Sequence, residues 1–413
     1  MGTLRHPIQH ITAYHAELTR LRRDLHAHPE LGFEESRTAA LVAAELERYG
    51  VDEIHRGVGK TGLVAVIRGA LPGRGRGEAG DGDPAVRAIG LRADMDALPL
   101  REDNEFPWRS GKIGVMHACG HDGHTTMLLG AARYLAATRQ FSGEAVCIFQ
   151  PAEEGLGGAK AMLDDGLFER FPVDAVYSMH NWPQLPPGRI GLAAGPMMAA
   201  ADRITITVCG PGGHGAHPEL CVDTVLVAAQ IVNAVQSVVS RNVNPNDQAV
   251  VSLCAVQGGD LSAMSVMPRN VTMVGTVRSF RAEVQALVEQ RLQQLVQAIA
   301  QGYGATAEVR YERIYPATVN TPDEAQHARR VAEELVGPSN VVPDLPPSMG
   351  AEDFAFMLQA RPGAYLRLGQ GGDAASFLHT ARYDFNDVVL PLGAALYARL
   401  AERALTPPVG AVP

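Results

Sequence analysis

The sequence lacks the features of a membrane or exported protein. No run of about 18 consecutive apolar residues, the length that a transmembrane helix needs, occurs in its 413 residues. The first twenty residues are polar and are interrupted by His and Pro, so they do not form the apolar core of a signal peptide. We therefore expect a cytoplasmic protein without a membrane partner.

Cysteine is also scarce. The five Cys residues are scattered and odd in number, which is not the pattern of a disulfide-bonded scaffold. Cys147, Cys209 and Cys254 lie in apolar, strand-like runs, where we expect them to pack as small hydrophobic side chains. Cys119 is different because His and Gly residues surround it.

An excess of positive charge is missing as well. Asp and Glu outnumber Lys and Arg by 45 to 36, and the resulting net charge of −9 argues against nucleic-acid binding. Hydrophobic residues make up 46% of the chain, which is enough for a sizeable core and excludes global disorder. The length predicts two domains, or three.

The strongest chemical signal is the segment Met116–His124, which reads MHACGHDGH. Cys119 and His121 are two residues apart, and on a turn or an extended segment this spacing can direct both side chains at one site. Gly120 and Gly123 allow a tight backbone there. A thiolate in such a position could bridge two cations, which would remove its proton.

Carboxylates and further imidazoles follow along the chain. Glu153 and Glu154 close an apolar run, and adjacent residues on an extended backbone point in different directions. We assign metal binding to Glu154 and the general base to Glu153; the alternative is a pair of solvated glutamates. The groups suited to divalent transition metals exceed the needs of one tetrahedral ion, so we predict a two-metal hydrolytic site. Its predicted ligands are Cys119, His121, Glu154, His180 and His379.

Two further residues are candidates for supporting roles. Asp94 lies just past an apolar run, where it could orient a ligating His, unless it is a turn residue or a helix cap. His214 lies in the Gly-rich segment Gly210–Pro218, where it could stabilise an oxyanion, unless the segment is a turn with an incidental His.

The pattern of apolar residues predicts two domains. Up to residue 198, short β-type runs alternate with helical segments, which predicts an α/β domain with a helix-covered, mixed sheet. The order from Asp202 to Ile314 is strand-helix-strand-strand-helix-strand, which is typical of a ferredoxin-like α+β unit. Because the metal ligands lie before and after it, we expect residues 199–314 to be an insertion in a discontinuous catalytic domain of residues 1–198 and 315–413. We expect the Gly-rich segment Leu71–Pro84 to be a surface hairpin rather than a phosphate loop.

Read together, the motifs resemble a known family. They cover nearly the whole chain in order: LRRDLHAHPELGFEE, RADMDALPL, MHACGHDGHTTMLLGAA, FQPAEEGLGGAKAMLDDG, MHNWP, GPGGHGAHPE, GAEDFAFM and LHTARYDFND. The chain resembles the aminoacylase/carboxypeptidase metallopeptidases, specifically the amidohydrolase branch with hippurate hydrolases and plant auxin-conjugate hydrolases. The resemblance implies the same five ligands and Glu153 as the base.

The resemblance also implies a homodimer. It would form through the inserted domain, with His214 reaching into the active site of the partner, and Arg278 would hold the carboxylate of the substrate. Arg278 could instead be an ordinary strand residue. The chain departs from the family at Ser265, where an Asn is common, and this difference puts an inherited substrate specificity in question.

We thus expect a metal-dependent amidohydrolase that cleaves the amide bond of N-acyl-L-amino acids. The donor set suits Mn²⁺ or Zn²⁺, and sites of this kind also accept Co²⁺ or Ni²⁺. The alternatives are a dipeptidase or carboxypeptidase of the same family, a catalytically silent metal-binding homologue, and an enzyme that uses Cys119 as a nucleophile.

Overall fold

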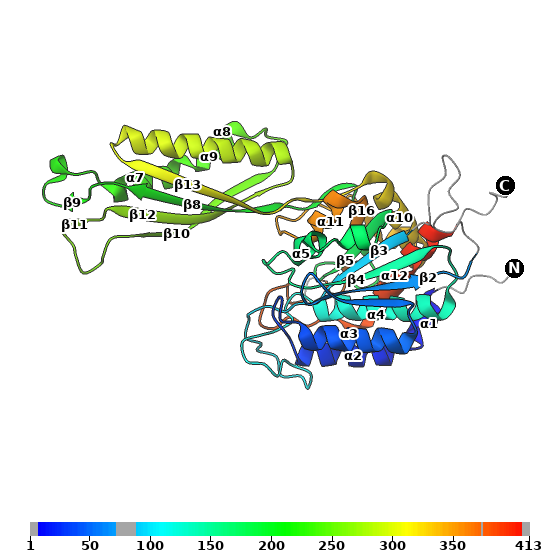
Figure 1. Ribbon diagram of the computed structural model, residues 1–413. Helices are drawn as coiled ribbons and strands as arrows, with labels where there is room; N and C mark the ends of the chain where they lie inside the picture. The colour runs from blue at the N-terminus through cyan, green and yellow to red at the C-terminus, as the bar shows by residue number, and fades with distance from the viewer. Residues whose placement is uncertain (1–6, 72–87, 373–374, 407–413) are drawn as a thin grey trace. The chain divides into compact units, whose positions relative to one another are not determined.

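The structure, a computed structural model, describes residues 7–71, 88–372 and 375–406 (Figure 1). The Gly-rich segment expected to be a surface hairpin lies almost entirely outside these residues. The chain divides into two compact units, which we describe separately. The first comprises residues up to 197, residues 319–346 and residues from 353 onward; the second comprises residues 198–318 and 347–352.

The first unit is built on one mixed sheet. Within the described residues it has eight strands, which are, in spatial order, β1 (Glu53–Val58), β2 (Gly62–Arg68), β4 (Glu144–Gln150), β3 (Ala88–Asp94), β5 (Ala175–Trp182), β16 (Gly363–Gly369), β6 (Ile190–Leu192) and β15 (Val341–Pro343). The four strands β4, β3, β5 and β16 run parallel, whereas β1, β2 and β4 pair antiparallel. The central strands are apolar and buried along nearly their whole length, as expected for a sheet covered on both faces. The predicted helix-covered mixed sheet is therefore confirmed.

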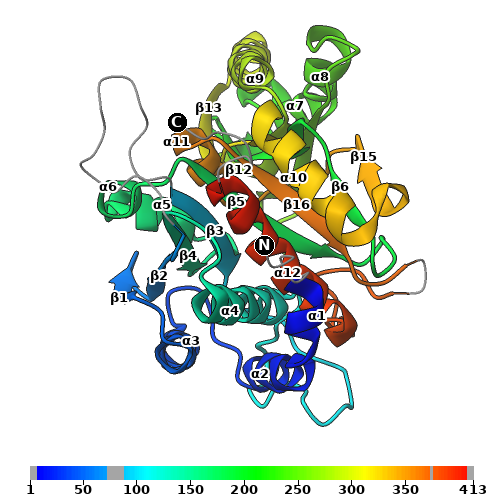
Figure 2. The same cartoon turned by 90° about the vertical axis from the view of Figure 1, so that its right-hand side faces the viewer.

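Helices cover this sheet. Those on the side of α4 are shown below the sheet in Figures 1 and 2 and include α1 (Pro7–Thr12), α2 (His15–Ala27), α3 (Ser36–Tyr49) and α4 (His121–Thr138). The remaining helices of the unit are α5 (Gly158–Asp164), α6 (Leu167–Arg170), α10 (Pro322–Val336), α11 (Phe354–Ala360) and α12 (Leu390–Leu405). Helices α4 and α12 pack against each other and against β3, and nearly every residue of both is buried.

The parallel strands determine where the site forms. Strands β3, β4 and β5 end at Asp94, Gln150 and Trp182, so their carboxyl ends lie along one edge of the sheet. In open α/β sheets, ligand sites gather at this edge. The motifs around Asp94, Glu153 and His180 thus meet at one place because each lies where a parallel strand ends.

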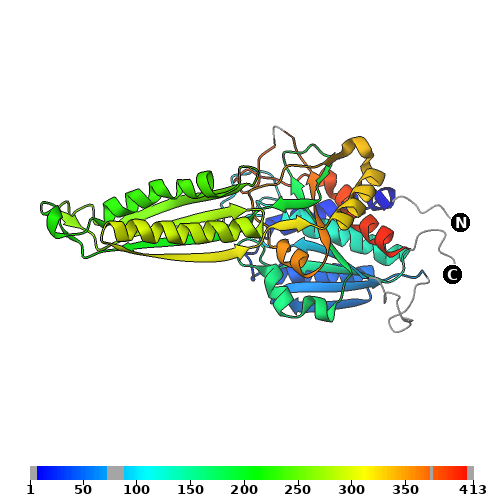
Figure 3. The ribbon, with the colours of Figure 1, turned by 90° about the horizontal axis from the view of Figure 1, so that it is seen from above.

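The second unit has a four-stranded antiparallel sheet with helices on one face. Its elements are β8 (Ala200–Cys209), α7 (Thr224–Ala234), α8 (Gln236–Asn242), β10 (Ala249–Gly258), β12 (Asn270–Ser279), α9 (Ala282–Gly302) and β13 (Thr306–Tyr315). The spatial order β10-β12-β8-β13 and the chain order together give the ferredoxin-like arrangement expected from the sequence. Figure 3 shows its helices lying side by side along the sheet. Two short strands, β9 (Gly213–His214) and β11 (Val266–Met267), pair antiparallel to each other beyond this sheet.

The second unit also takes in residues 347–352, a segment that the boundaries at 199 and 314 leave outside. Met198 forms a bridge with Ser348, and the amide of Ala199 donates to the carbonyl oxygens of Ser348 and Gly350 at 3.0 and 2.9 Å. These backbone pairs attach a distant segment to the start of β8, which is why local sequence patterns do not reveal it.

One helical stretch within the described residues, Thr224–Asn242, is long and apolar enough to cross a membrane. It covers α7 and α8, and its apolar side is part of the core of the second unit, where Val227, Ile231 and Val238 are buried. We therefore interpret it as part of the core of the second unit.

Candidate metal centre

The turn that carries Cys119 leads directly into α4. Gly120 occupies the N-cap position of this helix with φ +95°, in the left-handed region that favours glycine. The following residue, His121, is the first of the helix, and both Cys119 and His121 are buried. The tight turn expected from the Gly residues thus places the thiol and the imidazole at the sheet edge.

Cys119 lies at the centre of two donor groups. Its Sγ is 3.3 Å from Nε2 of His180 and 3.3 Å from Nε2 of His379. Cys119, His121 and His180 form one set whose donor atoms lie within 4.8 Å of one another, and Cys119, Glu154 and His379 form another. The structure therefore brings the five predicted ligands together, with the thiol shared between both sets.

His379 reaches this group from a loop that follows β16. Its φ of +59° is uncommon for a residue other than glycine, and its amide donates to the carbonyl oxygen of Ala118 at 2.8 Å. The side chain is half exposed, and Nε2 is 3.3 Å from Oε1 of Glu154. One backbone hydrogen bond therefore attaches this loop next to the Cys119 turn.

Aspartates behind the donor atoms orient them. Oδ1 of Asp96 is 3.2 Å from Nδ1 of His121, and Oδ2 of Asp96 accepts from the amide of Glu154 at 2.9 Å. Asp94 contacts Nδ1 of His124 at 2.6 Å and lies 3.7 Å from Nε2 of His121. A carboxylate on Nδ1 leaves Nε2 free to bind metal, which is the usual arrangement around a ligating His. Asp96 thus supports both His121 and the Glu154 loop.

Sequence reasoning named Asp94 and missed Asp96. The two residues belong to the same motif and are two positions apart, so in an extended segment their side chains point to the same side. This spacing of two residues was the sequence signal that could have identified Asp96. The structure places both carboxylates within reach of His121.

The electrostatics of the site favour cations. Burial raises the pKa of the Cys119 thiol well above its usual range, and the carboxylates of Glu154 and Glu153 raise it further. Burial lowers the pKa of His180 well below its usual range, so this imidazole is neutral and offers a lone pair. Burial alone would lower the pKa of His121, but Asp94 and Asp96 outweigh burial and raise it to about 10. Without a cation, a proton on His121 carries the charge that balances the carboxylates.

The donor set fits divalent metal ions by its chemistry. Nε2 of His121 is buried and makes no hydrogen bond, which is unfavourable unless another group satisfies it. Its neighbours are a thiol, two imidazoles and a carboxylate, the mixture of ligands that Zn²⁺ and related ions accept. A cation would also replace the proton on His121 and allow Cys119 to ionise.

Glu153 lies beside this donor set. Its carboxylate belongs to a third group, with His121 and Glu154, whose atoms lie within 4.8 Å of one another. The side chain is buried, and Oε1 accepts a hydrogen bond from the amide of Asp353 at 3.4 Å. The adjacent glutamates therefore occupy different positions: Glu154 is next to His379, and Glu153 is deeper.

The chain is similar to known proteins along most of its length. The family model for peptidase family M20/M25/M40 matches residues 90–403. The chain belongs to this family. It is 42% identical over 398 residues to a hippurate hydrolase of Campylobacter jejuni, covering 96% of this chain and 99% of the relative. It is 37% identical to an IAA-amino acid hydrolase of Arabidopsis thaliana over 94% of this chain and 85% of the relative.

A solved structure agrees with this assignment. The chain matches a dinuclear metal binding peptidase from the M20 family of Bacillus subtilis with a TM-score of 0.81 and 33% identity, covering 95% of this chain and 99% of that one. The resemblance to the amidohydrolase branch of this family is thereby confirmed. As a member of the M20 family, the chain is a metallo-hydrolase that acts on carbon–nitrogen bonds.

Two predicted site residues of this M20 chain lie in the second unit. His214 is exposed on β9, and its Nδ1 accepts from the amide of Ala216 at 3.1 Å. Arg278 is half-buried on β12, where burial lowers its pKa, and its Nη1 donates to the carbonyl oxygen of Val277 at 3.0 Å. Neither residue belongs to the cluster in the first unit, so their roles remain predictions.

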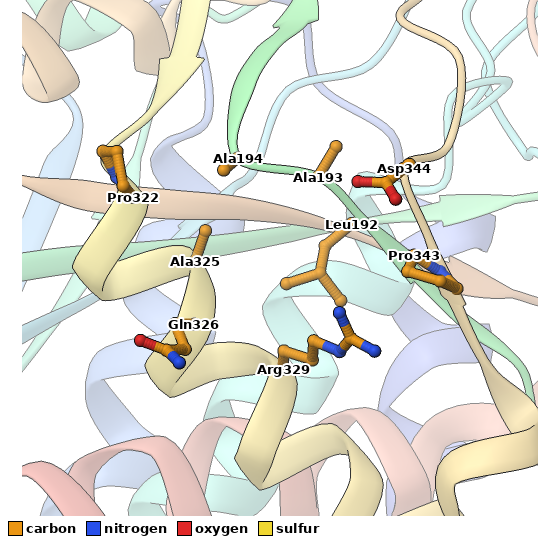
Figure 4. Close-up of a pocket in the computed structure, with 9 residues that line it drawn as sticks. All are labelled: Leu192, Ala193, Ala194, Pro322, Ala325, Gln326, Arg329, Pro343 and Asp344. Atoms are coloured by element: carbon orange, nitrogen blue, oxygen red, sulfur yellow. The ribbon is translucent and has the colours of Figure 1, made fainter.

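A cavity of about 140 Å³ lies elsewhere in the first unit, away from the predicted ligands. Its lining includes Leu192, Arg329 and Asp344, which come from the end of β6, from α10 and from the segment after β15 (Figure 4). None of the five predicted ligands and no glutamate lines it. This cavity is therefore separate from the cluster of predicted ligands.

Proposed function

We propose that this chain hydrolyses the amide bond of N-acyl-L-amino acids, hippurate-like or related conjugates. The observation that carries the proposal is the pair of donor sets joined at Cys119, with the buried carboxylate of Glu153 beside them. Relatives named hippurate hydrolase and IAA-amino acid hydrolase support an acyl group joined to an amino acid.

Two divalent ions, Mn²⁺ or Zn²⁺, with Co²⁺ or Ni²⁺ as substitutes, fit the cluster in this proposal. Bound there, they would lower the pKa of a water and polarise the substrate carbonyl. Their ligands would be Cys119, His121, Glu154, His180 and His379. Asp96 and Asp94 would keep the imidazoles oriented.

In this proposal Glu153 transfers the protons. Its carboxylate takes a proton as water attacks the carbonyl and later delivers a proton to the leaving amine. A buried carboxylate near cations can have a pKa suited to both steps. His214 would donate a hydrogen bond to the oxyanion, and Arg278 would hold the α-carboxylate of the substrate through its planar fork.

His214 would act in the active site of a partner chain, so we propose a homodimer in the cytoplasm. The second unit offers a surface suited to pairing. Strand β10 is at the end of its sheet, and its second half is exposed, with Val256 57% accessible. An unpaired strand edge with exposed apolar side chains is a ready template for another chain.

A peptidase activity is the second candidate. The chain is 36% identical over 93% of its length to a relative from Saccharolobus solfataricus named thermostable carboxypeptidase 1. A catalytically silent homologue is less favoured because every predicted ligand and the base are present. A thiol nucleophile is disfavoured because burial and neighbouring carboxylates hold Cys119 in its protonated form.

An assay of amine release tests the proposal. We expect cleavage of N-benzoylglycine, N-acetyl amino acids or indole-acetyl amino acids, loss of this activity on chelation, and its return with Mn²⁺ or Zn²⁺. Activity on free dipeptides alone would favour the peptidase candidate. Activity that survives complete removal of metal, verified by elemental analysis, would contradict the proposal.

Replacing Asp96 by Asn should weaken metal binding. The amide would no longer balance the charge at His121, and removal of such a partner typically lowers metal affinity about 10- to 100-fold. Calorimetric titration of the metal-free protein measures this change. Asp165→Asn is a matched control, because Asp165 accepts from the amide of Gly59 and does not contact the cluster. Equal affinities in both variants would exclude the supporting role of Asp96.

A further inference from the structure

Two of the three glutamates in the N-terminal motif PELGFEE, Glu30 and Glu35, have different partners. Oε1 and Oε2 of Glu30 accept hydrogen bonds from the amides of Arg37 and Thr38 at 3.0 and 2.8 Å. These amides belong to the first turn of α3, where backbone donors have no partner within the helix. Glu30 therefore caps α3.

Glu35 occupies the N-cap position of α3 but does not cap it. Its side chain is completely buried and points away from the helix end. Oε1 accepts from the amide of Ala152 at 2.8 Å, and Oε2 accepts from the hydroxyl of Thr61 at 2.5 Å. Because Glu30 already satisfies the helix, the carboxylate of Glu35 is available to the segment that contains Ala152.

Ala152 has an unusual backbone and immediately precedes Glu153. Its φ of +54° lies in the left-handed region, which is unfavourable for a residue with a Cβ. Such a conformation persists only where the surroundings enforce it. Gly32 leaves room for this turn, because a Cβ on residue 32 would come within 3.0 Å of both Cα and Cβ of Ala152.

The neighbours of Ala152 are held from other directions. The carbonyl oxygen of Ala152 accepts from the amide of Gly158 at 3.0 Å, and Asp96 accepts from the amide of Glu154. The amide of Ala152 donates to Glu35. Each side of Glu153 in the chain is thus attached through an amide to a buried carboxylate from another motif.

We propose that Glu35 is a positioning residue for Glu153: its hydrogen bond to the amide of Ala152 holds the left-handed turn that aims the Glu153 carboxylate at the metal cluster. This inference rests on the proposed function, in which Glu153 transfers the protons. The length of the Glu35 side chain matters for this role, and its charge does not, because the amide of Ala152 needs only an acceptor oxygen at this distance. Burial and nearby Asp96 raise the pKa of Glu35, so the buried position disfavours its charged form.

Two conservative substitutions at Glu35 test the length of the side chain and its charge separately. Glu35→Gln keeps the length of the side chain and an oxygen for the amide of Ala152, and we expect it to retain most of the wild-type kcat. Glu35→Asp keeps the carboxylate but is one methylene shorter. Because small misplacements of catalytic groups are costly, we expect its kcat to fall about 10- to 100-fold with KM and metal content nearly unchanged.

Glu30 provides the matched control. Glu30→Asp shortens the same kind of side chain in the same motif, so it should lower the melting temperature through α3 while kcat stays near wild type. A wild-type kcat for Glu35→Asp, or Glu35→Gln falling further than Glu35→Asp, would overturn the inference. Equal losses of kcat in Glu35→Asp and Glu30→Asp would also overturn it, since the effect would then be general destabilisation.

A parallel Glu153→Gln variant tests the catalytic role of Glu153 separately from the positioning role of Glu35. If Glu153→Gln keeps wild-type turnover, the proton-transfer role that the proposed function gives to Glu153 fails, and the Glu35 measurements no longer bear on a catalytic base. If Glu153→Gln is inactive while Glu35→Asp is fully active, only the positioning role fails.

Discussion

Glu153→Gln should lower kcat by roughly two to four decades, the range that a positioned general base contributes. The amide has almost the shape of the carboxylate and can still accept from the amide of Asp353, but it cannot take a proton from water. The five predicted ligands are unchanged, so the metal content should stay the same. Steady-state kinetics on the best N-acyl amino acid, with elemental analysis of the same sample, measure both quantities.

A control separates the base from a general effect of losing a carboxylate. Glu169→Gln, in the exposed part of α6, changes the same functional group away from the cluster and should leave kcat unchanged. Turnover in Glu153→Gln within a few-fold of wild type would contradict the assignment of the base. If Glu153→Gln also loses bound metal, Glu153 is a metal ligand. Metal content is measured for this reason, because Glu153 lies beside His121 and Glu154.

Much of the fold could be predicted from local patterns. The stripe of apolar residues between Glu283 and Gln301 becomes α9, whose Val284, Val288 and Leu292 are buried in the core of the second unit. Strands such as β4 and β5 are short apolar runs, and the structure buries them. These elements could be predicted because each depends on the periodicity of its own sequence.

The site could be predicted less completely. Cys119 and His121 were visible because five metal-binding or acidic side chains fall within one short segment. His379 had a weaker local signal, and the resemblance to a family strengthened its assignment. In the structure, a backbone hydrogen bond to Ala118 joins its loop to the Cys119 turn across more than 250 residues of chain. No periodicity encodes a contact of that kind.

The role of Glu35 is another feature that the local sequence does not reveal. Glu35 occupies the N-cap position of α3, next to the free amides of the first turn. In the structure, however, Glu30 accepts from those amides and Glu35 accepts from the amide of Ala152. Which of two glutamates performs each task depends on a loop more than 100 residues away, so it can be found only from the folded chain.

His214→Ala should reduce kcat about 10²- to 10³-fold, the usual cost of removing one oxyanion donor. The metal content should not change, because His214 lies outside the cluster of predicted ligands. The side chain is exposed, so its removal should leave the melting temperature close to that of the wild type. Kinetics and thermal unfolding of the single variant test these expectations.

The stronger test asks which subunit supplies His214. Glu153→Gln and His214→Ala chains, co-expressed with different tags, should form mixed dimers in which one of the two sites has both residues intact. With random pairing half of the dimers are mixed, so total activity should recover to about a quarter of wild type if His214 acts across a two-fold interface. Each variant expressed alone is the control and should stay inactive. Mixed dimers purified by both tags that remain inactive would show that His214 serves its own chain, because a site completed within one chain cannot be restored by a partner.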